Sequence, residues 1–204
     1  MRVRRSGRSL ALICVAVATA AIGGCTQTTP GAAAPPATTP PTSAGSAAPK
    51  VSKPLPNIAD YVNKVCDLVP AALIAQLGFA YPLSTGTDNA LGPGCAWAST
   101  ASTPSRSLGV SVQSDGTKGN GGIANVLKLN GSLYAFVELT SVSGYPAAYA
   151  DMRDDRAQGK CSMLVGVTDD VTFGVNVQGY SGAQDSCDTV NQVAASVITT
   201  LQGG

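Results

Sequence analysis

The clearest hydrophobic pattern in the chain runs from residue 185 to residue 201 and has the spacing of a helix. Its apolar residues lie three or four positions apart, at Val190, Val193, Ala194, Val197, Ile198 and Leu201. Such steps place them in one stripe along a helix that faces a core. Asp185 or Ser186 is suited to cap the N-terminus of this helix, and Gly203 and Gly204 follow its end.

Two shorter helices are predicted earlier in the chain. Residues 69–78 combine Pro70, which suits the first helical position, with Gly78, which suits the C-terminal stop. Residues 123–129 repeat the helical spacing after a glycine-rich loop over residues 116–122. Between these helices the periodicity changes to that of strands.

Strands are predicted where apolar and polar residues alternate. The predicted strands cover residues 95–98, 108–112, 134–139, 147–152, 161–167 and 171–177. Asp169 and Asp170 lie between the last two strands, which therefore form a hairpin. Alternating strands of this kind are typical of an antiparallel sheet with one packed face and one face in water. The order of the elements predicts an α+β fold, an antiparallel sheet covered by helices, the C-terminal helix among them.

The first 24 residues have the pattern of a secretory signal peptide. Four arginines precede an apolar run of 13 residues, 10–22, which is shorter than the about 20 residues that a membrane span needs. The run ends in Ile22-Gly23-Gly24-Cys25, which resembles a bacterial lipobox. We therefore expect cleavage after residue 24, a lipid on the thiol of Cys25, and attachment to the outer face of the cell membrane. An ordinary signal peptide with a chance cysteine is the alternative.

A tether and one domain are expected to follow. Residues 25–57 comprise the lipidated N-terminus and a segment rich in Thr, Ala, Ser and Pro. A segment with so little to bury cannot offset the entropy lost on ordering, so we expect it to be disordered. Residues 58–204 have the length of a single domain.

The charge of the chain is low and nearly balanced. It has 13 Lys and Arg, 12 Asp and Glu, and no histidine. Histidine-based catalysis and histidine metal sites are excluded, and nucleic acid is not an expected partner because it requires a basic surplus. Removal of residues 1–24 takes away four arginines and no acidic residue, which leaves nine basic and 12 acidic residues and a net charge of about −3. Anionic headgroups would not attract such a chain, so the lipid must supply the attachment.

Four cysteines lie in the predicted domain: Cys66, Cys95, Cys161 and Cys187. Export places them in an oxidising compartment, where disulfides are favoured. No Cys-x-x-Cys spacing is present, which disfavours a zinc ribbon. Of the three pairings that four cysteines allow, we expect Cys66–Cys95 and Cys161–Cys187, since each joins neighbouring segments at one end of the domain. A redox pair is the functional alternative.

Three aromatic residues are candidates for ligand contact. Trp97 lies two positions after Cys95, so both residues face the same side of a strand. Its ring is expected to pack in the core beside a disulfide, with a stacking platform for a ligand as the alternative. Tyr145 precedes Pro146 and is therefore extended, either at a structural corner or at the mouth of a pocket. A pocket lined by Trp97, Tyr134 and Tyr145 would suit a small apolar ligand.

Motifs for catalysis are scarce. The predicted domain has no Gly-x-Ser-x-Gly elbow, no Ser-x-x-Lys and no phosphate-binding loop. Two groups of aspartates have the composition of paired carboxylates or calcium ligands: Asp169 with Asp170, and Asp151 with Asp154 and Asp155. The first group fits a hairpin turn better, and Arg153 and Arg156 flank the second group as in a solvated polar loop. We therefore expect no enzyme, no metal and no cofactor.

Five short motifs occur in the order that is found in a known family. They are Cys66-Asp67-Leu68-Val69 before a short helix, Gly94-Cys95-Ala96-Trp97, Gly144-Tyr145-Pro146-Ala147, Cys161-x-Met163-x-Val165, and Cys187 at the start of the last helix. Together they resemble actinobacterial lipoproteins of the domain-of-unknown-function family 3558, over nearly all of residues 58–204. The resemblance implies an exported lipoprotein with a disulfide-braced α+β domain, and it transfers no catalytic residue.

The sequence therefore predicts a lipid-anchored lipoprotein of the cell envelope. Its folded domain is expected to be a non-catalytic binding or accessory module, with a small apolar ligand or another envelope protein as its partner. The alternative is a hydrolase of envelope material, which would need two aspartates facing each other across a cleft.

Overall fold

The computed structural model describes residues 48–86, 92–99, 101, 105–113 and 119–203. The predicted signal peptide over residues 1–24, the predicted lipidation of Cys25 and the predicted tether up to residue 47 lie outside the described residues.

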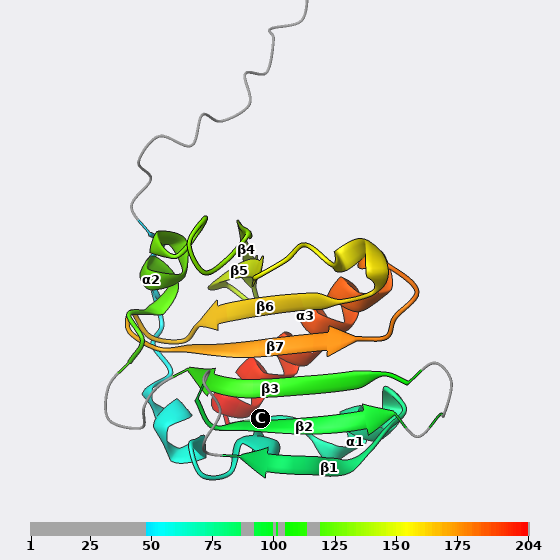
Figure 1. Cartoon of the computed structure of the whole chain (residues 1–204). Helices are drawn as coiled ribbons and strands as arrows, with labels where there is room; N and C mark the ends of the chain where they lie inside the picture. The colour runs from blue at the N-terminus through cyan, green and yellow to red at the C-terminus, as the bar shows by residue number, and fades with distance from the viewer. Residues whose placement is uncertain (1–47, 87–91, 100, 102–104, 114–118, 204) are drawn as a thin grey trace, which may run out of the picture. The chain divides into compact units, whose positions relative to one another are not determined.

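Seven strands and several helices make up the described part of the chain. The helices are η1 (Pro56–Tyr61), η2 (Val65–Leu68), α1 (Ala71–Gln76), α2 (Gly122–Lys128), η3 (Arg156–Gln158) and α3 (Ala183–Leu201), where η marks a short 3-10 helix. The strands are β1 (Phe79–Gly86), β2 (Gly94–Ser99), β3 (Ser107–Gln113), β4 (Phe136–Val142), β5 (Tyr145–Asp151), β6 (Cys161–Gly166) and β7 (Thr172–Gln178). They form one antiparallel sheet in the order β1-β2-β3-β7-β6-β5-β4 (Figure 1). The predicted α+β class, an antiparallel sheet covered by helices, is confirmed.

The main hydrophobic core lies between α3 and one face of the sheet. The stripe predicted for the C-terminal helix is buried along its whole length, as Val190, Val193, Ala194, Val197, Ile198 and Leu201. On the sheet, buried side chains come into register across neighbouring strands, as at Val110 of β3, Val175 of β7 and Met163 of β6. Removal of this apolar surface from water is the main source of stability for the domain.

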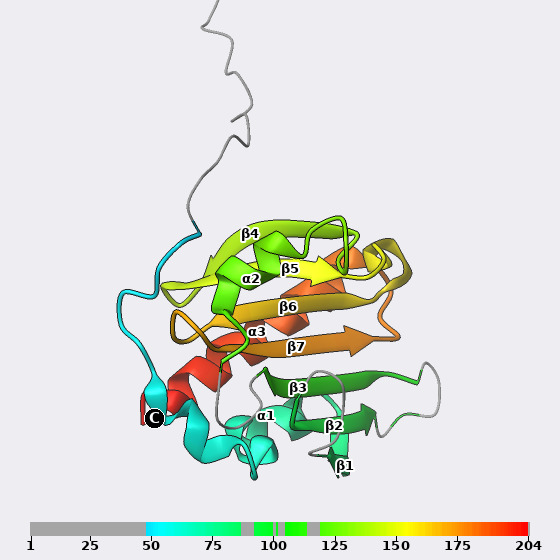
Figure 2. The ribbon, with the colours of Figure 1, turned by 60° about the vertical axis from the view of Figure 1, so that its left-hand side comes forward.

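The opposite face of the sheet is partly covered by α2, so it is not simply the wet face that the alternation predicts. Ile123 and Val126 of α2 form a second cluster with Ala148 and Ala150 of β5 and Leu164 of β6. Figure 2 shows α2 and α3 on opposite sides of the sheet. The alanines of β5 present a flat surface, which lets the short helix approach the strands closely.

The glycine-rich stretch before α2 holds this helix close to the hairpin between β6 and β7. The N–H of Gly121 donates to the carbonyl oxygen of Asp170 over 3.0 Å. A Cβ at Gly122 would lie 2.2 Å from the carbonyl oxygen of Asp169, and both glycines have positive φ angles, 84° and 58°. Side chains are therefore excluded here by contact and by backbone conformation. The hairpin predicted around Asp169 and Asp170 is confirmed.

Strand β1 is missing from the prediction because its sequence, FAYPLSTG, does not alternate and contains Pro82. β1 lies at one edge of the sheet, and its pairing with β2 has a register shift on each side of Pro82. Proline is tolerated at sheet edges and at bulges, where its missing N–H breaks no regular ladder. Pattern analysis alone does not distinguish such a strand from a loop.

The β4–β5 hairpin differs from the predicted arrangement in its turn. Tyr145 and Pro146 are not a corner but the first two residues of strand β5. The turn is made by Ser143 and Gly144, which have φ angles of 49° and 83°. Strand β4 begins two residues after Tyr134, so this tyrosine lies in the approach to the strand rather than in it.

Helix α3 begins earlier than predicted. Its first residue is Ala183 and its cap position is Gly182, so neither Asp185 nor Ser186 is the N-cap. Both are inside the first turn, where the carboxylate of Asp185 accepts a hydrogen bond from the hydroxyl of Ser181. In the described part of the chain, no helix combines the length and the hydropathy needed to cross a membrane.

The folded domain begins before residue 58. Residues 48–57, which the composition assigns to the disordered tether, are ordered against the β6–β7 hairpin, and we name residues 48–55 the N-terminal arm. The N–H of Leu55 donates to the carbonyl oxygen of Val167 over 2.8 Å. The side chains of Leu55 and Val51 pack against the main core. Two apolar residues in a proline-rich segment are enough for docking once a complementary surface is present, which composition cannot reveal.

Candidate functional site

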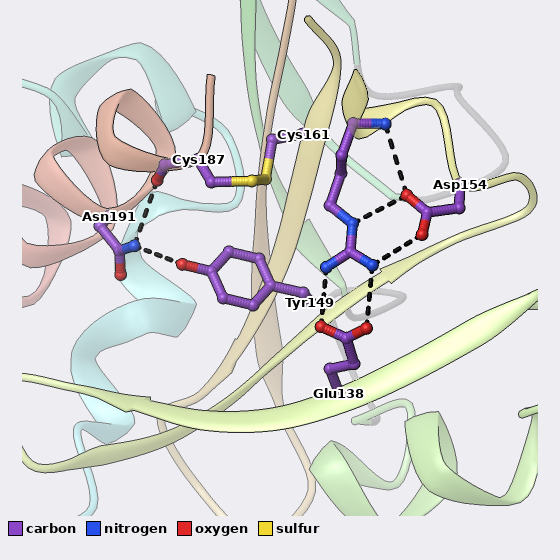
Figure 3. Close-up of polar contacts among 7 residues, drawn as sticks. Glu138, Tyr149, Asp154, Cys161, Cys187 and Asn191 are labelled. Atoms are coloured by element: carbon purple, nitrogen blue, oxygen red, sulfur yellow. Dashed lines mark hydrogen bonds and ion pairs between the residues drawn. A yellow bond between two sulfur atoms is a disulfide. The ribbon is translucent and has the colours of Figure 1, made fainter. Parts of the chain in front are cut away.

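Two disulfides join all four cysteines of the domain. Cys66 of η2 is bonded to Cys95 of β2, 29 residues away, and Cys161 of β6 is bonded to Cys187 of α3, 26 residues away. This is the predicted pairing. Each bond ties a helix to the buried face of a strand, and the two bonds brace opposite halves of the sheet. Figure 3 shows the second bond between its two elements.

The three predicted aromatic residues do not line a common pocket in the described structure. Trp97 and Tyr145 are buried in the main core, where Trp97 lies beside the first disulfide on the same face of β2 as Cys95. Tyr134 packs against the second cluster, on the α2 side of the sheet. Burial and, secondarily, the carboxylate of Asp151 raise the pKa of the Tyr134 hydroxyl. The structure therefore brings Trp97 and Tyr145 into one core and separates Tyr134 from them.

A charged cluster forms around Arg156, at the ends of β4 and β5. The guanidinium donates two hydrogen bonds to Glu138, of 2.7 and 2.8 Å. It also donates two to Asp154, again of 2.7 and 2.8 Å. Figure 3 shows Glu138 and Asp154 on two sides of the guanidinium. The guanidinium also lies over the ring of Phe136, 4.4 Å from its centroid, so it combines a ring contact with its hydrogen bonds.

This arrangement keeps the two carboxylates ionised. Hydrogen bonds from Arg156 lower the pKa of Glu138 and the pKa of Asp154 below their usual values. The same bonds raise the pKa of the Arg156 guanidinium. A general acid requires a carboxyl group whose pKa is raised towards neutrality, and these two groups shift in the opposite direction.

A second set of ion pairs continues the cluster. Lys160 lies 3.7 Å from Asp151 and 3.8 Å from Asp155, and Arg153 lies 3.2 Å from Asp155. The hydroxyl of Ser162 donates to Asp151 over 2.8 Å. The sequence predicted only a solvated polar loop here. In the structure the aspartates of this loop form ion pairs, namely Asp151, Asp154 and Asp155. Within the described residues, no three His, Cys, Asp or Glu side chains are grouped so as to hold a metal ion.

A polar contact joins β5 to α3 beside the second disulfide. The side-chain amide of Asn191 donates to the hydroxyl of Tyr149 and, over 3.1 Å, to the carbonyl oxygen of Cys187 (Figure 3). Sequence analysis missed this pair, because residues 42 positions apart carry no common periodic signal. Its geometry is that of a structural bridge between sheet and helix.

The N-terminal arm contributes a small pocket. The carboxylate of Asp169 accepts hydrogen bonds from the N–H of Val51 and from Lys50, each of 3.1 Å. The hydrogen bond from Val51 and then that from Lys50 lower the pKa of Asp169. The pocket beside them has a volume of about 220 Å³ and is lined by the arm, α2 and the hairpin turn. Typical ligand pockets have about 300–1,000 Å³, so this pocket is small for an organic ligand.

The fold and the two cystines define the class of this protein as an α+β domain with a seven-stranded antiparallel sheet, braced by a disulfide in each half. A family model described as "Protein of unknown function (DUF3558)" matches residues 20–200. Because the match spans most of the chain, the chain belongs to this family, and the predicted membership is confirmed. No curated protein matches the chain, and no solved structure matches it.

Proposed function

We propose that this chain is a lipid-anchored lipoprotein of the cell envelope, whose folded domain is a non-catalytic binding or accessory module. The lipid is carried by Cys25, and the domain lies on the outer face of the membrane, beyond a tether. The observation that carries this proposal is the motif Ile22-Gly23-Gly24-Cys25 at the end of a signal-peptide pattern.

The cysteines of the chain support export. Six are present, and the four in the domain are paired with one another. Disulfides persist in extracytoplasmic compartments and are rare in reducing ones. Of the other two, Cys14 lies inside the apolar run that the signal peptidase would remove. Cys25 is then the one cysteine of the mature chain that these two disulfides do not use.

The geometry of the domain supports a binding or accessory role rather than catalysis. The aromatic residues best suited to contact a ligand, Trp97 and Tyr145, are buried in the main core. The carboxylates of the charged cluster are neutralised by Arg153, Arg156 and Lys160. Another envelope protein is therefore the favoured partner over a small apolar ligand, since a protein needs a surface and not a cavity.

Metabolic labelling with an alkyne analogue of palmitate tests the anchor. We expect the wild-type chain to be labelled and the Cys25→Ala variant to be unlabelled. Cys14→Ala is the matched control, because it removes the other cysteine of the N-terminal segment and should leave labelling intact. Equal labelling of wild type and Cys25→Ala, or no labelling of wild type, would contradict the proposal.

Crosslinking of the wild-type protein in its own membrane tests the binding role. Mass spectrometry of the products should identify a recurring polypeptide that is joined to residues of the folded domain. Crosslinks confined to lipid or to the chain itself would argue against a partner protein.

A further inference from the structure

The two edges of the sheet are built differently. β1 has Pro82 and two register shifts, devices that prevent an edge strand from pairing with another chain. β4, at the other edge, pairs with β5 through all seven of its residues without a register shift. Its sequence, FVELTSV, has no proline, glycine or lysine. β4 is therefore a regular strand whose outer edge lacks these devices. Figure 2 shows it at the margin of the sheet.

The backbone groups that point outward from β4 follow from the turn. Ser143 and Gly144 both have positive φ angles, as in a type I′ turn, which is closed by a hydrogen bond between the residues that flank it. Val142 and Tyr145 are those residues. Because hydrogen-bonded and non-hydrogen-bonded pairs alternate in an antiparallel ladder, the N–H and C=O groups of Val137, Leu139 and Ser141 point away from β5.

Pro146 agrees with this assignment. It lies opposite Ser141 of β4, in a pair that exchanges no hydrogen bonds, so its missing N–H costs the β4–β5 ladder nothing. On its other side, the pairing of β5 with β6 begins only at Ala147. Pro146 therefore lies just outside the ladder between β5 and β6 and leaves the ladder between β4 and β5 complete.

Exposed apolar side chains occur in the β4–β5 hairpin and directly beside it in the chain. Among the residues whose side-chain exposure the structure describes, which leaves out most of β1, the large hydrophobic side chains that remain exposed are Leu133 at 44%, Leu139 at 48% and Met152 at 67%. Leu139 is the central residue of β4, Leu133 precedes the strand, and Met152 directly follows β5. Their concentration in one hairpin and its approach is unlike the single, scattered exposed residues that are normal on a monomer.

The one charge on β4 is already neutralised. Glu138 is the only ionisable residue in the strand, and Arg156 binds both of its carboxylate oxygens. A charge on an edge strand ordinarily opposes the approach of a second strand. Here the guanidinium and the ring of Phe136 beneath it hold that charge in an ion pair.

We propose that β4 pairs with β4 of a second copy of this chain, antiparallel and about a two-fold axis at Leu139. The outward-pointing groups are symmetric about this residue, so Val137 of each copy pairs with Ser141 of the other and Leu139 pairs with itself. Glu138 then faces Thr140 of the second copy, and no like charges stand directly opposite. The two sheets become one continuous sheet across the dimer.

A second copy fits this edge because the edge is self-complementary. A two-fold interface uses the same patch on both sides, and the central position of this patch is the exposed Leu139, which the pairing places against Leu139 of the second copy. The inference goes beyond the proposed function, since it concerns pairing between two copies of the chain and neither the lipid anchor nor a partner protein.

Site-directed crosslinking in membranes of cells that express the full chain tests the proposal. Leu139 is replaced by cysteine and treated with a short bifunctional maleimide, which can join two residues whose Cα atoms are about 5.5 Å apart. The expected product has twice the mass of the chain. Asn176→Cys, on an exposed position of the central strand β7, is the matched control and should give at least about tenfold less of it. No doubled product, equal yields at both positions, or a product of Leu139→Cys with another polypeptide would overturn the proposal.

A second variant guards against misfolding of the first. Leu139→Lys keeps the hairpin and places a charge at the axis, so sedimentation of the detergent-extracted chain should shift from dimer to monomer, with a dissociation constant raised about tenfold or more. The Cys25→Ala chain should remain dimeric, which separates failure of this inference from failure of the lipid anchor. A wild-type chain that sediments as a monomer, or a Leu139→Lys variant that stays dimeric, would refute strand pairing.

Discussion

The two ends of the sheet are stabilised by different means. At the β1 end the strand is irregular, with Pro82 and two register shifts, and a covalent bond from Cys66 to Cys95 secures the neighbouring strand β2. At the β4 end the hairpin is regular, and a cluster of ion pairs around Arg156 holds it to the segment before β6.

The difference shows how one sheet can prevent strand pairing at one edge and permit it at the other. Pro82 and the register shifts on each side of it interrupt the ladder at β1, so extension of the sheet by another strand is disfavoured there. Regular backbone at β4 offers a full row of aligned N–H and C=O groups, and the single charge of Glu138 is paired. An edge that is open in this way is suited to association.

Loss of a disulfide should have the largest effect and should act on one end at a time. The chain-entropy model predicts a cost of about 3.5 kcal/mol for each bond, since the two loops have nearly equal lengths. We expect the double variant Cys66→Ala, Cys95→Ala to loosen β1 and β2, and Cys161→Ala, Cys187→Ala to loosen α3 against β6. Denaturant unfolding measures the cost, and amide hydrogen exchange locates it.

The two double variants are controls for each other. If both produce the same exchange pattern over the whole sheet, the ends are one cooperative unit and the comparison between them fails. A cost below about 1 kcal/mol for either bond would mean that residual packing constrains the unfolded variant chain as the disulfide constrained the wild type.

Elements that depend on one dominant neighbour were predictable from the sequence. The apolar stripe of α3 was predictable because a helix that packs on a sheet must bury the same side at every turn. The β6–β7 hairpin alternates because one side of each strand meets that helix. The disulfide pairing followed from the same local order, since each bond joins elements close in the chain.

Elements that depend on distant partners were not predictable. The arm is fixed by contacts such as that between Val51 and Asp169, 118 residues apart, and its own composition resembles that of a tether. Glu138 meets Arg156 only because β4 and β5 form a hairpin. A signal for the charged cluster was present, since six of the ten residues 151–160 are charged in a chain that is 12% charged, but its partner on β4 carried none.

Introducing a proline into β4, as β1 has at Pro82, should have the next largest effect on stability. It tests whether the two edge strands differ in the way described. Thr140→Pro removes an N–H that points into the ladder with β5, opposite Ala147, and should lower the free energy of unfolding by about 2–3 kcal/mol. Leu139→Pro removes an N–H that points outward and should cost about 1 kcal/mol or less. Denaturant unfolding at low protein concentration measures both without a contribution from association.

Alanine variants at the same two positions subtract the loss of the original side chains. Equal costs of the two prolines, after this correction, would mean that the backbone of Leu139 does not point outward. The open edge would then lose its geometric basis, and β4 would resemble β1.

Arg156→Gln should have the smallest effect on stability and the most specific dependence on pH. The side chains of Glu138 and Asp154 are 54% and 49% exposed, so solvent screening limits the expected loss to about 1 kcal/mol at pH 7. Arg156 lowers the pKa of both carboxyl groups in the folded state, so its stabilisation is complete above their unfolded pKa values, about 4, and disappears as the pH falls through the lower folded values. Urea unfolding should therefore show a difference from wild type of about 1 kcal/mol at pH 7 and a vanishing difference near pH 2. A difference that persists in acid would instead assign the role of Arg156 to its packing over Phe136, which does not titrate.

Arg156→Gln also removes the ion-pair partner of Glu138 on the edge strand β4. The same variant should therefore weaken pairing between copies of the chain at pH 7. A dimer whose dissociation constant does not change in this variant would show that the copies do not meet at this edge.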